Sequence, residues 1–240
     1  MTEHPSWQYD EMQQIGKDYD DLTEVEAYDA RHGRFRDVEK ENEDILKSLD
    51  LRSDHVLIEF GSGTGAFAMQ AAARCARVYA VDISRAMLEY AKKRAVKAGL
   101  ANIVFCHSGF LTYSPIAQTA DAVVSNTALH HLPDFWKGMA LRRMNTMLKS
   151  GGLLYLSDVI FEQGNVREHI GRFIAKLETL AGPDIRKDVE AHIRQEFSTY
   201  DWIIDGLLER AGFGIVNKAI KAGVTGRYLC RKETDAVKKA

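Results

Sequence analysis

Residues 56–65 have the sequence VLIEFGSGTG, and this stretch decides the fold. The segment from Val56 to Phe60 is apolar except for Glu59, which is typical of a parallel strand covered on both faces. The glycines that follow, at positions 61, 63 and 65, permit a sharp turn and a close approach of the backbone to a ligand. Strong helix formers begin at Ala66. We therefore predict a buried strand, a glycine-rich turn, and a helix whose first N–H groups face a ligand.

Two acidic residues add information, because a glycine-rich turn alone also fits a loose dinucleotide-binding fingerprint. Glu59 lies two residues before Gly61, where a carboxylate could meet an ammonium group or accept from backbone N–H groups. Asp82 ends the next apolar stretch, residues 77–81, where a carboxylate can accept from ribose hydroxyls. Asp82 could also cap the helix that follows. The two acids favour a ligand that carries both a ribose and a cationic group.

Four motifs in order along the chain resemble the class I S-adenosylmethionine-dependent methyltransferases. They are EFGSGTG at 59–65, VDISRAML at 81–88, ALHHLPD at 128–134 and LKSGGLL at 148–154. The resemblance covers residues 50 to 160 well and the remainder loosely. It implies S-adenosylmethionine as the cofactor and S-adenosylhomocysteine as its product. The expected cofactor-binding residues are Tyr28, Glu59, Gly61, Ser62, Gly63, Thr64, Gly65, Asp82, Ile83, Met87, Ser108, Gly109, Phe110, Asn126, Thr127 and His131.

One position departs from the family pattern. Many relatives have an aspartate where Gly109 stands, and that aspartate accepts from the adenine amino group. We expect the adenine contacts to come instead from Ser108, from backbone groups, and from apolar walls such as Ile83 and Phe110.

His130 and His131 are adjacent, and adjacent residues on a helical turn point about 100° apart, so they cannot share one task. We expect His130 to face the methyl acceptor, where a histidine could act as general base, and His131 to brace the cofactor side. Asp158 ends the fifth strand and could orient the acceptor or take its proton. Each of the three could instead be structural.

The pattern predicts an α/β fold: a doubly wound, mostly parallel seven-stranded sheet with helices on both faces. Within a single domain, 1–240, we expect an N-terminal helical cap over 1–50, including short helices ending near Ile15–Gly16 and across 23–31. A cofactor-binding core follows over 51–160, with a helix ending at Gly151–Gly152. Beyond it we predict a helical lid over 161–197, a helix and antiparallel hairpin over 198–232 that opens with a capping box at Ser198, and a frayed tail over 233–240.

The amino-acid composition limits which kinds of partner the chain is expected to bind. Of 240 residues, 45% are hydrophobic and 28% charged, as in an ordinary globular protein. Among the first 50 residues, 15 acids face 6 Lys or Arg, so this end would repel nucleic-acid phosphates. We expect no nucleic-acid or membrane partner, no metal site, and either a monomer or a homodimer. Three widely spaced cysteines and the absence of a signal-peptide pattern suggest the cytoplasm.

We therefore interpret the chain as a methyltransferase that acts on a small, neutral or cationic molecule by in-line displacement. Two alternatives stay open at this point. One is a non-catalytic S-adenosylmethionine-binding protein; the other is a nicotinamide-dependent oxidoreductase that uses the same turn. The segment from Asn126 to Asp134 favours methyl transfer over the second alternative, because it matches the methyltransferase pattern.

Overall fold

A single mixed sheet organises the computed structural model, which describes residues 5–13, 15, 19–115 and 119–233. Its strands are β1 (Val56–Phe60), β2 (Arg77–Asp82), β3 (Ile103–His107), β4 (Ala120–Asn126), β5 (Leu148–Phe161), β6 (Thr199–Tyr200), β7 (Phe213–Lys221) and β8 (Thr225–Lys232). The order is β3-β2-β1-β4-β5-β8-β7, with β6 paired to β5. Strands β1 to β5 are mutually parallel, and β8 runs antiparallel to β5 and β7. The predicted seven-stranded sheet with a C-terminal hairpin is confirmed, with the two-residue β6 in addition.

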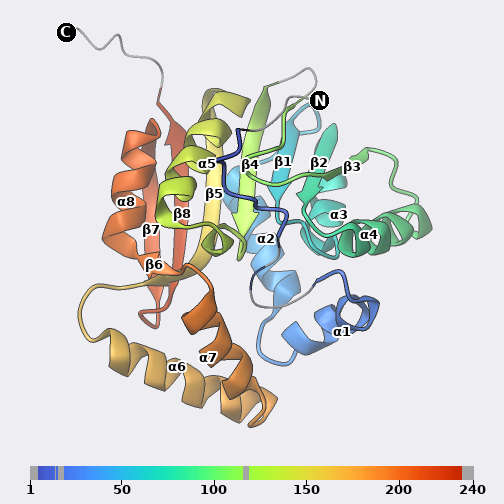
Figure 1. Cartoon of the computed structure of the whole chain (residues 1–240). Coiled ribbons are helices and arrows are strands. Elements are labelled where there is room, and N and C mark those ends of the chain that lie inside the picture. The colour runs from blue at the N-terminus through green and yellow to red at the C-terminus, as the bar shows by residue number, and fades with distance from the viewer. Residues whose placement is uncertain (1–4, 14, 16–18, 116–118, 234–240) are drawn as a thin grey trace, which may run out of the picture.

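Helices cover both faces of this sheet (Figure 1). They are α1 (Leu22–His32), α2 (Val38–Leu49), α3 (Ala66–Ala72), α4 (Arg85–Lys97), α5 (Asp134–Met147), α6 (Val166–Ala181), α7 (Ile185–Gln195) and α8 (Asp201–Arg210), with a 3-10 turn η1 at Leu129–His131. Because neighbouring strand residues point to opposite faces, β1 contributes to two cores. Ile58 packs in the core that includes α5 and α8, and Leu57 in the core that includes α2 and α3.

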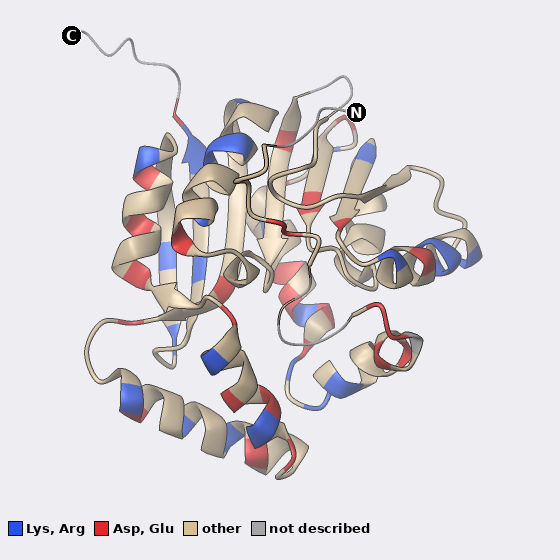
Figure 2. Cartoon of the chain, in the orientation of Figure 1, with Lys and Arg blue, Asp and Glu red and all other residues tan. Residues whose placement is uncertain are grey.

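The carboxyl ends of the parallel strands face α1, α6 and α7 (Figure 1). Gly182, which adopts a φ of 93°, separates α6 from α7. Lys and Arg are mixed with Asp and Glu along both helices (Figure 2), so the pair carries both signs of charge. None of the helices in the described ranges has the length and apolar character that crossing a bilayer requires.

Three local expectations differ from the structure. Residues 151 and 152 do not end a helix: α5 gives way directly to β5, and these glycines lie where the pairing of β4 and β5 shifts register between Ala120 and Ala122. Ser198 is not the N-cap of α8, because its hydroxyl lies 3.1 Å from His192 Nε2 and Tyr200 holds the cap position.

The third difference concerns the N-terminal segment. Residues 5–13 form turns rather than the helix expected to end near Ile15–Gly16, and Gly16 itself lies outside the described residues. The second expected helix is present as α1, whose N-cap Asp21 accepts from the Thr23 amide at 2.8 Å. The predicted tail also falls almost wholly outside the described ranges.

Candidate functional site

The glycine turn after β1 forms the floor of a pocket at the carboxyl edge of the sheet. The amides of Gly61 and Ser62 donate to the Val81 carbonyl at 2.9 and 3.1 Å, which closes the turn against β2. Gly61 has a φ of 70°, and a Cβ there would lie 2.3 Å from the Ala128 Cβ. Gly63 has a φ of 50° with nothing within 4 Å of an added Cβ, so its backbone is open to a ligand.

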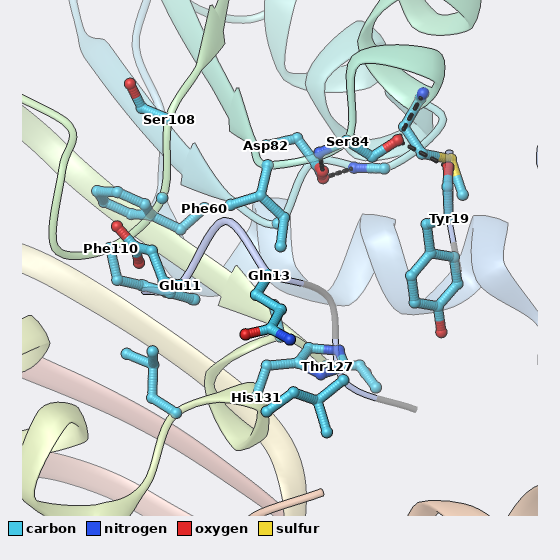
Figure 3. Close-up of a pocket in the computed structure, with 18 of the residues that line it drawn as sticks. Glu11, Gln13, Tyr19, Phe60, Asp82, Ser84, Ser108, Phe110, Thr127 and His131 are labelled. Atoms are coloured by element: carbon cyan, nitrogen blue, oxygen red, sulfur yellow. Dashed lines mark hydrogen bonds between the residues drawn. The ribbon is translucent and has the colours of Figure 1, made fainter. Parts of the chain in front are cut away.

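Asp82 holds this turn in place from the end of β2. Its Oδ2 accepts from the Gly63 amide at 2.7 Å and its Oδ1 from the Ser84 amide at 2.8 Å (Figure 3). Burial raises the pKa of the carboxyl group, and these two amides oppose the shift. A carboxylate fixed at the wall of the pocket can also accept from the hydroxyls of a ribose.

Aromatic and apolar side chains line the part of the pocket nearest β3. The Phe60 and Phe110 rings stack with centroids 5.1 Å apart. Ile83, Met87 and Ser108 complete this wall. Glu11 enters from the N-terminal segment and lies beside Phe110 (Figure 3). Flat apolar surfaces with one acid suit an aromatic base that carries hydrogen-bond donors.

The N-terminal segment and α1 also contribute side chains to the pocket lining. Gln13, Ile15, Tyr19 and Tyr28 all line it. Ser84 fixes this segment to the start of α4, because its hydroxyl lies 2.7 Å from the Tyr19 carbonyl.

Helix α1 is anchored to the glycine turn by Asp29. Its carboxylate accepts from the Thr64 hydroxyl at 2.7 Å and from Arg94 Nη1, also at 2.7 Å. Thr64 therefore contributes to the docking of α1 and does not line the pocket.

A buried network of histidines and acids lies beside the pocket. Nδ1 of His130 is bonded to the Asp158 carboxylate, and Nε2 of His130 lies 2.9 Å from Glu196 Oε2. Nδ1 of His192 lies 2.5 Å from the same Glu196 oxygen. Burial alone would lower the pKa of His130, but the two carboxylates outweigh it and raise that pKa to about 9. His131 behaves oppositely: burial, and then the charge of His130, lower its pKa to about 4.

The ligand atoms of His130, His192 and Glu196 lie within 4.8 Å of one another, a spacing that could hold a metal ion. The sequence spacings gave no indication of this group. The direct hydrogen bonds from both imidazoles to Glu196 account for the arrangement without an ion.

The structure brings most of the sequence-predicted residues to one pocket. Its lining includes Tyr28, Gly61, Gly63, Asp82, Ile83, Met87, Ser108, Gly109, Phe110, Thr127 and His131. Six predicted cofactor residues or acceptor-side residues lie close by without lining it: Ser62, Thr64, Gly65, Asn126, His130 and Asp158. The expected orientation of the two histidines differs from the structure, because His130 is 3% exposed between two carboxylates while His131 lines the pocket.

Glu59 also lies outside the pocket lining. It is 4% exposed, the Ala68 amide stabilises its charged form, and its Oε2 has no partner within the described residues. Burial, and then the nearby Asp82 carboxylate, raise its pKa well above the usual range. Glu59 is therefore a buried acid at the end of β1 that does not line the pocket.

Sequence reasoning missed eight lining residues: Glu11, Gln13, Ile15, Tyr19, Phe60, Ser84, Ala128 and Leu132. The segment that carries the first three has no periodic pattern, and its course over the sheet edge is set by tertiary contacts. Glu196 was also missed, although its spacing of four from His192 on a predicted helix places the two side chains on one face.

The pocket fits S-adenosylmethionine better than a dinucleotide. The charged side chains in the described part of the lining are the acids Glu11 and Asp82, and that part contains no Lys or Arg that would pair with a pyrophosphate.

Comparison with known proteins agrees with this chemistry. A family model described as a methyltransferase domain matches residues 57–152. An uncharacterized methyltransferase of Geobacillus kaustophilus is 28% identical over 208 residues, which cover 83% of this chain and 90% of that protein.

Solved structures share the fold. A SAM-dependent methyltransferase from Aquifex aeolicus superposes with a TM-score of 0.62 at 18% identity, over 88% of this chain and 98% of its own. The N-methyltransferase NodS from Bradyrhizobium japonicum, solved with S-adenosylhomocysteine, gives a TM-score of 0.58 at 18% identity, over 82% and 87% of the two chains.

Proposed function

Because the chain belongs to the class I S-adenosylmethionine-dependent methyltransferases, we propose that it methylates a small molecule held in the pocket beneath its N-terminal segment. The observation that carries this proposal is that one pocket is lined together by the glycine turn, Asp82 and Tyr19.

Bound S-adenosylmethionine supplies an electrophilic methyl group on a sulfonium that is already a good leaving group. The residues of the chain then have three tasks: to bind, to align and to exclude water. Gly63 and Asp82 hold the cofactor side of the pocket, where the backbone is open and a carboxylate is fixed. Tyr28 and the segment above it exclude solvent.

The acceptor would lie toward Thr127, His131 and Leu132, at the ends of β4 and η1. His131 makes ring contact with Tyr19, with centroids 6.4 Å apart. With a pKa near 4, His131 is neutral at pH 7 and only weakly basic, so it suits a hydrogen-bond acceptor better than a strong general base. Alignment of the acceptor, rather than removal of its proton, would therefore supply most of the rate.

Two features support a small, neutral or cationic acceptor. The N-terminal residues Gln13, Ile15 and Tyr19 line the pocket, so a macromolecular acceptor would have to fit beside them. The charged side chains in the described lining are the acids Glu11 and Asp82, which disfavour an anion. The α6–α7 hairpin, tied to η1 through Glu196, would act as the lid on the acceptor side.

A cofactor-turnover assay tests the proposal. Purified protein is incubated with S-adenosylmethionine and separate panels of amines, phenols and thiols, with tRNA and duplex DNA as macromolecular panels. Mass spectrometry then detects the methylated product and S-adenosylhomocysteine. We expect product from at least one small molecule with wild type and little with Asp82→Ala. Tight binding and methylation of a nucleic acid would refute the small-molecule assignment, and cofactor binding without any product would favour the non-catalytic binding protein.

We also propose a cytoplasmic location, since Cys75, Cys106 and Cys230 are all free thiols. Detection of a native disulfide between any two of these cysteines, by mass spectrometry of protein purified from its host, would contradict a cytoplasmic location.

A further inference from the structure

Glu11 places a carboxylate inside the wall of the pocket. The residue is 5% exposed and comes from the N-terminal segment. Its Oε1 accepts from the amides of Leu111 and Thr112, both at 2.8 Å, and from the Thr112 hydroxyl at 2.9 Å. Its Oε2 is buried and has no hydrogen-bond partner in the described part of the chain. One half of the carboxylate therefore has its donors, and the other half lacks one.

A buried carboxylate oxygen without a donor is unfavourable, because burial removes the water that would have solvated it. Desolvation accordingly raises the pKa of Glu11, although Thr112 and the neighbouring amides oppose the shift. An N–H group of a ligand in the pocket would satisfy Oε2 and stabilise the charged form.

Gly109 is the residue that makes room for this carboxylate. A Cβ at position 109 would lie 2.3 Å from Glu11 Cδ and 2.4 Å from Glu11 Oε2. Any side chain at 109 would therefore collide with Glu11. Gly109, two residues after β3, and the acid from the N-terminal segment therefore form a matched pair, in which the segment supplies the carboxylate that a glycine lacks.

The surroundings of Glu11 indicate what its free oxygen meets. Asp82 ends β2, and a ribose held there would direct its base toward β3, the neighbouring strand. The stacked rings of Phe60 and Phe110 give that side of the pocket flat apolar walls. Glu11 and Phe110 lie together in Figure 3, on the same side as Ser108. A planar base between these walls would turn its polar edge toward the carboxylate.

We propose that Glu11 recognises the exocyclic amino group of adenine and so makes the pocket selective for an adenosyl cofactor. This rests on the proposed placement of the cofactor in the pocket. An amino group offers N–H donors, which a carboxylate accepts, whereas the carbonyl oxygen of hypoxanthine would face the same carboxylate with a second acceptor. Because Glu11 belongs to the N-terminal segment, binding of the base and docking of that segment are coupled.

A pair of ligands that differ at one edge of the base tests the proposal. S-adenosylhomocysteine carries an amino group at position 6 of the base and no hydrogen on N1, whereas S-inosylhomocysteine carries an oxygen at position 6 and a hydrogen on N1. Calorimetry gives the Kd of each for wild type, for Glu11→Gln, and for Glu26→Gln, an exposed acid of α1 that serves as the matched control. Circular dichroism and thermal melting check the folding of each variant.

We expect wild type to prefer the adenosine ligand by about tenfold or more (~1.4 kcal/mol). In Glu11→Gln the amide oxygen can still accept from Leu111 and Thr112, while its NH₂ group replaces Oε2 and favours an acceptor on the base. The preference should therefore vanish or invert, whereas Glu26→Gln should keep the wild-type ratio.

Three results would overturn the inference. If Glu11→Gln keeps the wild-type ratio, Glu11 does not recognise the base, although the cofactor site stands. If wild type binds both ligands equally, the same conclusion follows without any variant, even where Glu11→Gln fails to fold. If wild type binds neither ligand, the placement of the cofactor itself is wrong and the role of Glu11 is refuted with it.

Discussion

His130 Nε2 lies 2.9 Å from Glu196 Oε2, and this contact joins the turn after β4 to the residue that follows α7. The Phe197 amide donates to the His130 carbonyl at 2.8 Å, which adds a backbone connection at the same place. Asp158, from β5, accepts from the other nitrogen of the ring. The α6–α7 hairpin is thus fixed to the carboxyl edge of the sheet through one buried imidazole.

Removing the carboxylate of Glu196 should strongly destabilise the protein. Glu196→Ala would leave two imidazoles without their shared acceptor, and losing one member of a buried ion pair typically costs about 3–5 kcal/mol. Urea denaturation measures the free energy of unfolding. The matched control is Glu190→Ala on α7, a partly exposed acid 3.5 Å from Arg186, for which we expect a loss of about 0.5 kcal/mol or less. Similar losses in the two variants would show that the Glu196 contact does not fix the hairpin.

The protonated state of His130 should make stability fall at alkaline pH. Its pKa is raised from 6.5 to about 9, so the stabilisation is complete below pH 6.5 and is lost as the pH rises through 9. Between these values the free energy of unfolding of wild type should fall, relative to His130→Asn, by on the order of 3 kcal/mol.

The comparison is confined to pH 6.5–9.5 because His131 titrates below it. Its pKa is lowered to about 4, so its contribution is present above 6.5 and is lost only as the pH falls. His55→Asn, which lies outside the network, provides the matched control. Its free energy of unfolding should change with pH as that of wild type does. If the free energies of unfolding of wild type and His130→Asn change equally with pH over this range, His130 is not charged in the folded protein.

The alternation of strands and helices could be predicted from the sequence because it depends on local patterns. Apolar runs mark β1 and β2, and Ser84 marks the start of α4, where its hydroxyl accepts from the Met87 amide. Gly151 misled the prediction, because glycine suits a helix end and a shift in strand register equally well.

The site was predictable where it depends on the strand ends and not where it depends on distant segments. Asp82 could be predicted from its position as the last residue of β2, and Gly61 from its position directly after β1. The sequence indicates that His130 and His131 have separate tasks, but Asp158 and Glu196, which decide which ring is buried, come from remote elements. Glu11 could not be placed because residues 5–13 form turns without periodicity.

Asp82→Ala should weaken binding of S-adenosylhomocysteine by about tenfold or more (~1.4 kcal/mol). The carboxylate orders the Gly63 amide and faces the pocket, so its loss removes a ligand contact and frees the turn. Asp121→Ala provides a matched control, since Asp121 accepts from the Val56 amide at 2.8 Å at the opposite end of β1. Calorimetry should show an unchanged Kd for Asp121→Ala, although its melting temperature falls. Equal losses of affinity in the two variants would mean that Asp82 acts only through stability.

Gly61→Ala should be more damaging than a glycine substitution with the same backbone angle elsewhere. Gly61 and Gly99 have φ values of 70° and 71°, so an alanine at either position pays the left-handed penalty of about 1–2 kcal/mol. At Gly99 an added Cβ meets nothing within 4 Å, whereas at Gly61 it would lie 2.3 Å from the Ala128 Cβ. Overpacking of this kind adds about 1–3 kcal/mol. In urea denaturation, the free energy of unfolding of Gly61→Ala should therefore be lower than that of Gly99→Ala by about 1–3 kcal/mol. Of the two variants, only Gly61→Ala should lose affinity for S-adenosylhomocysteine. Equal destabilisation would show that the turn can move away from Ala128, and the glycine would then be required only for its φ angle.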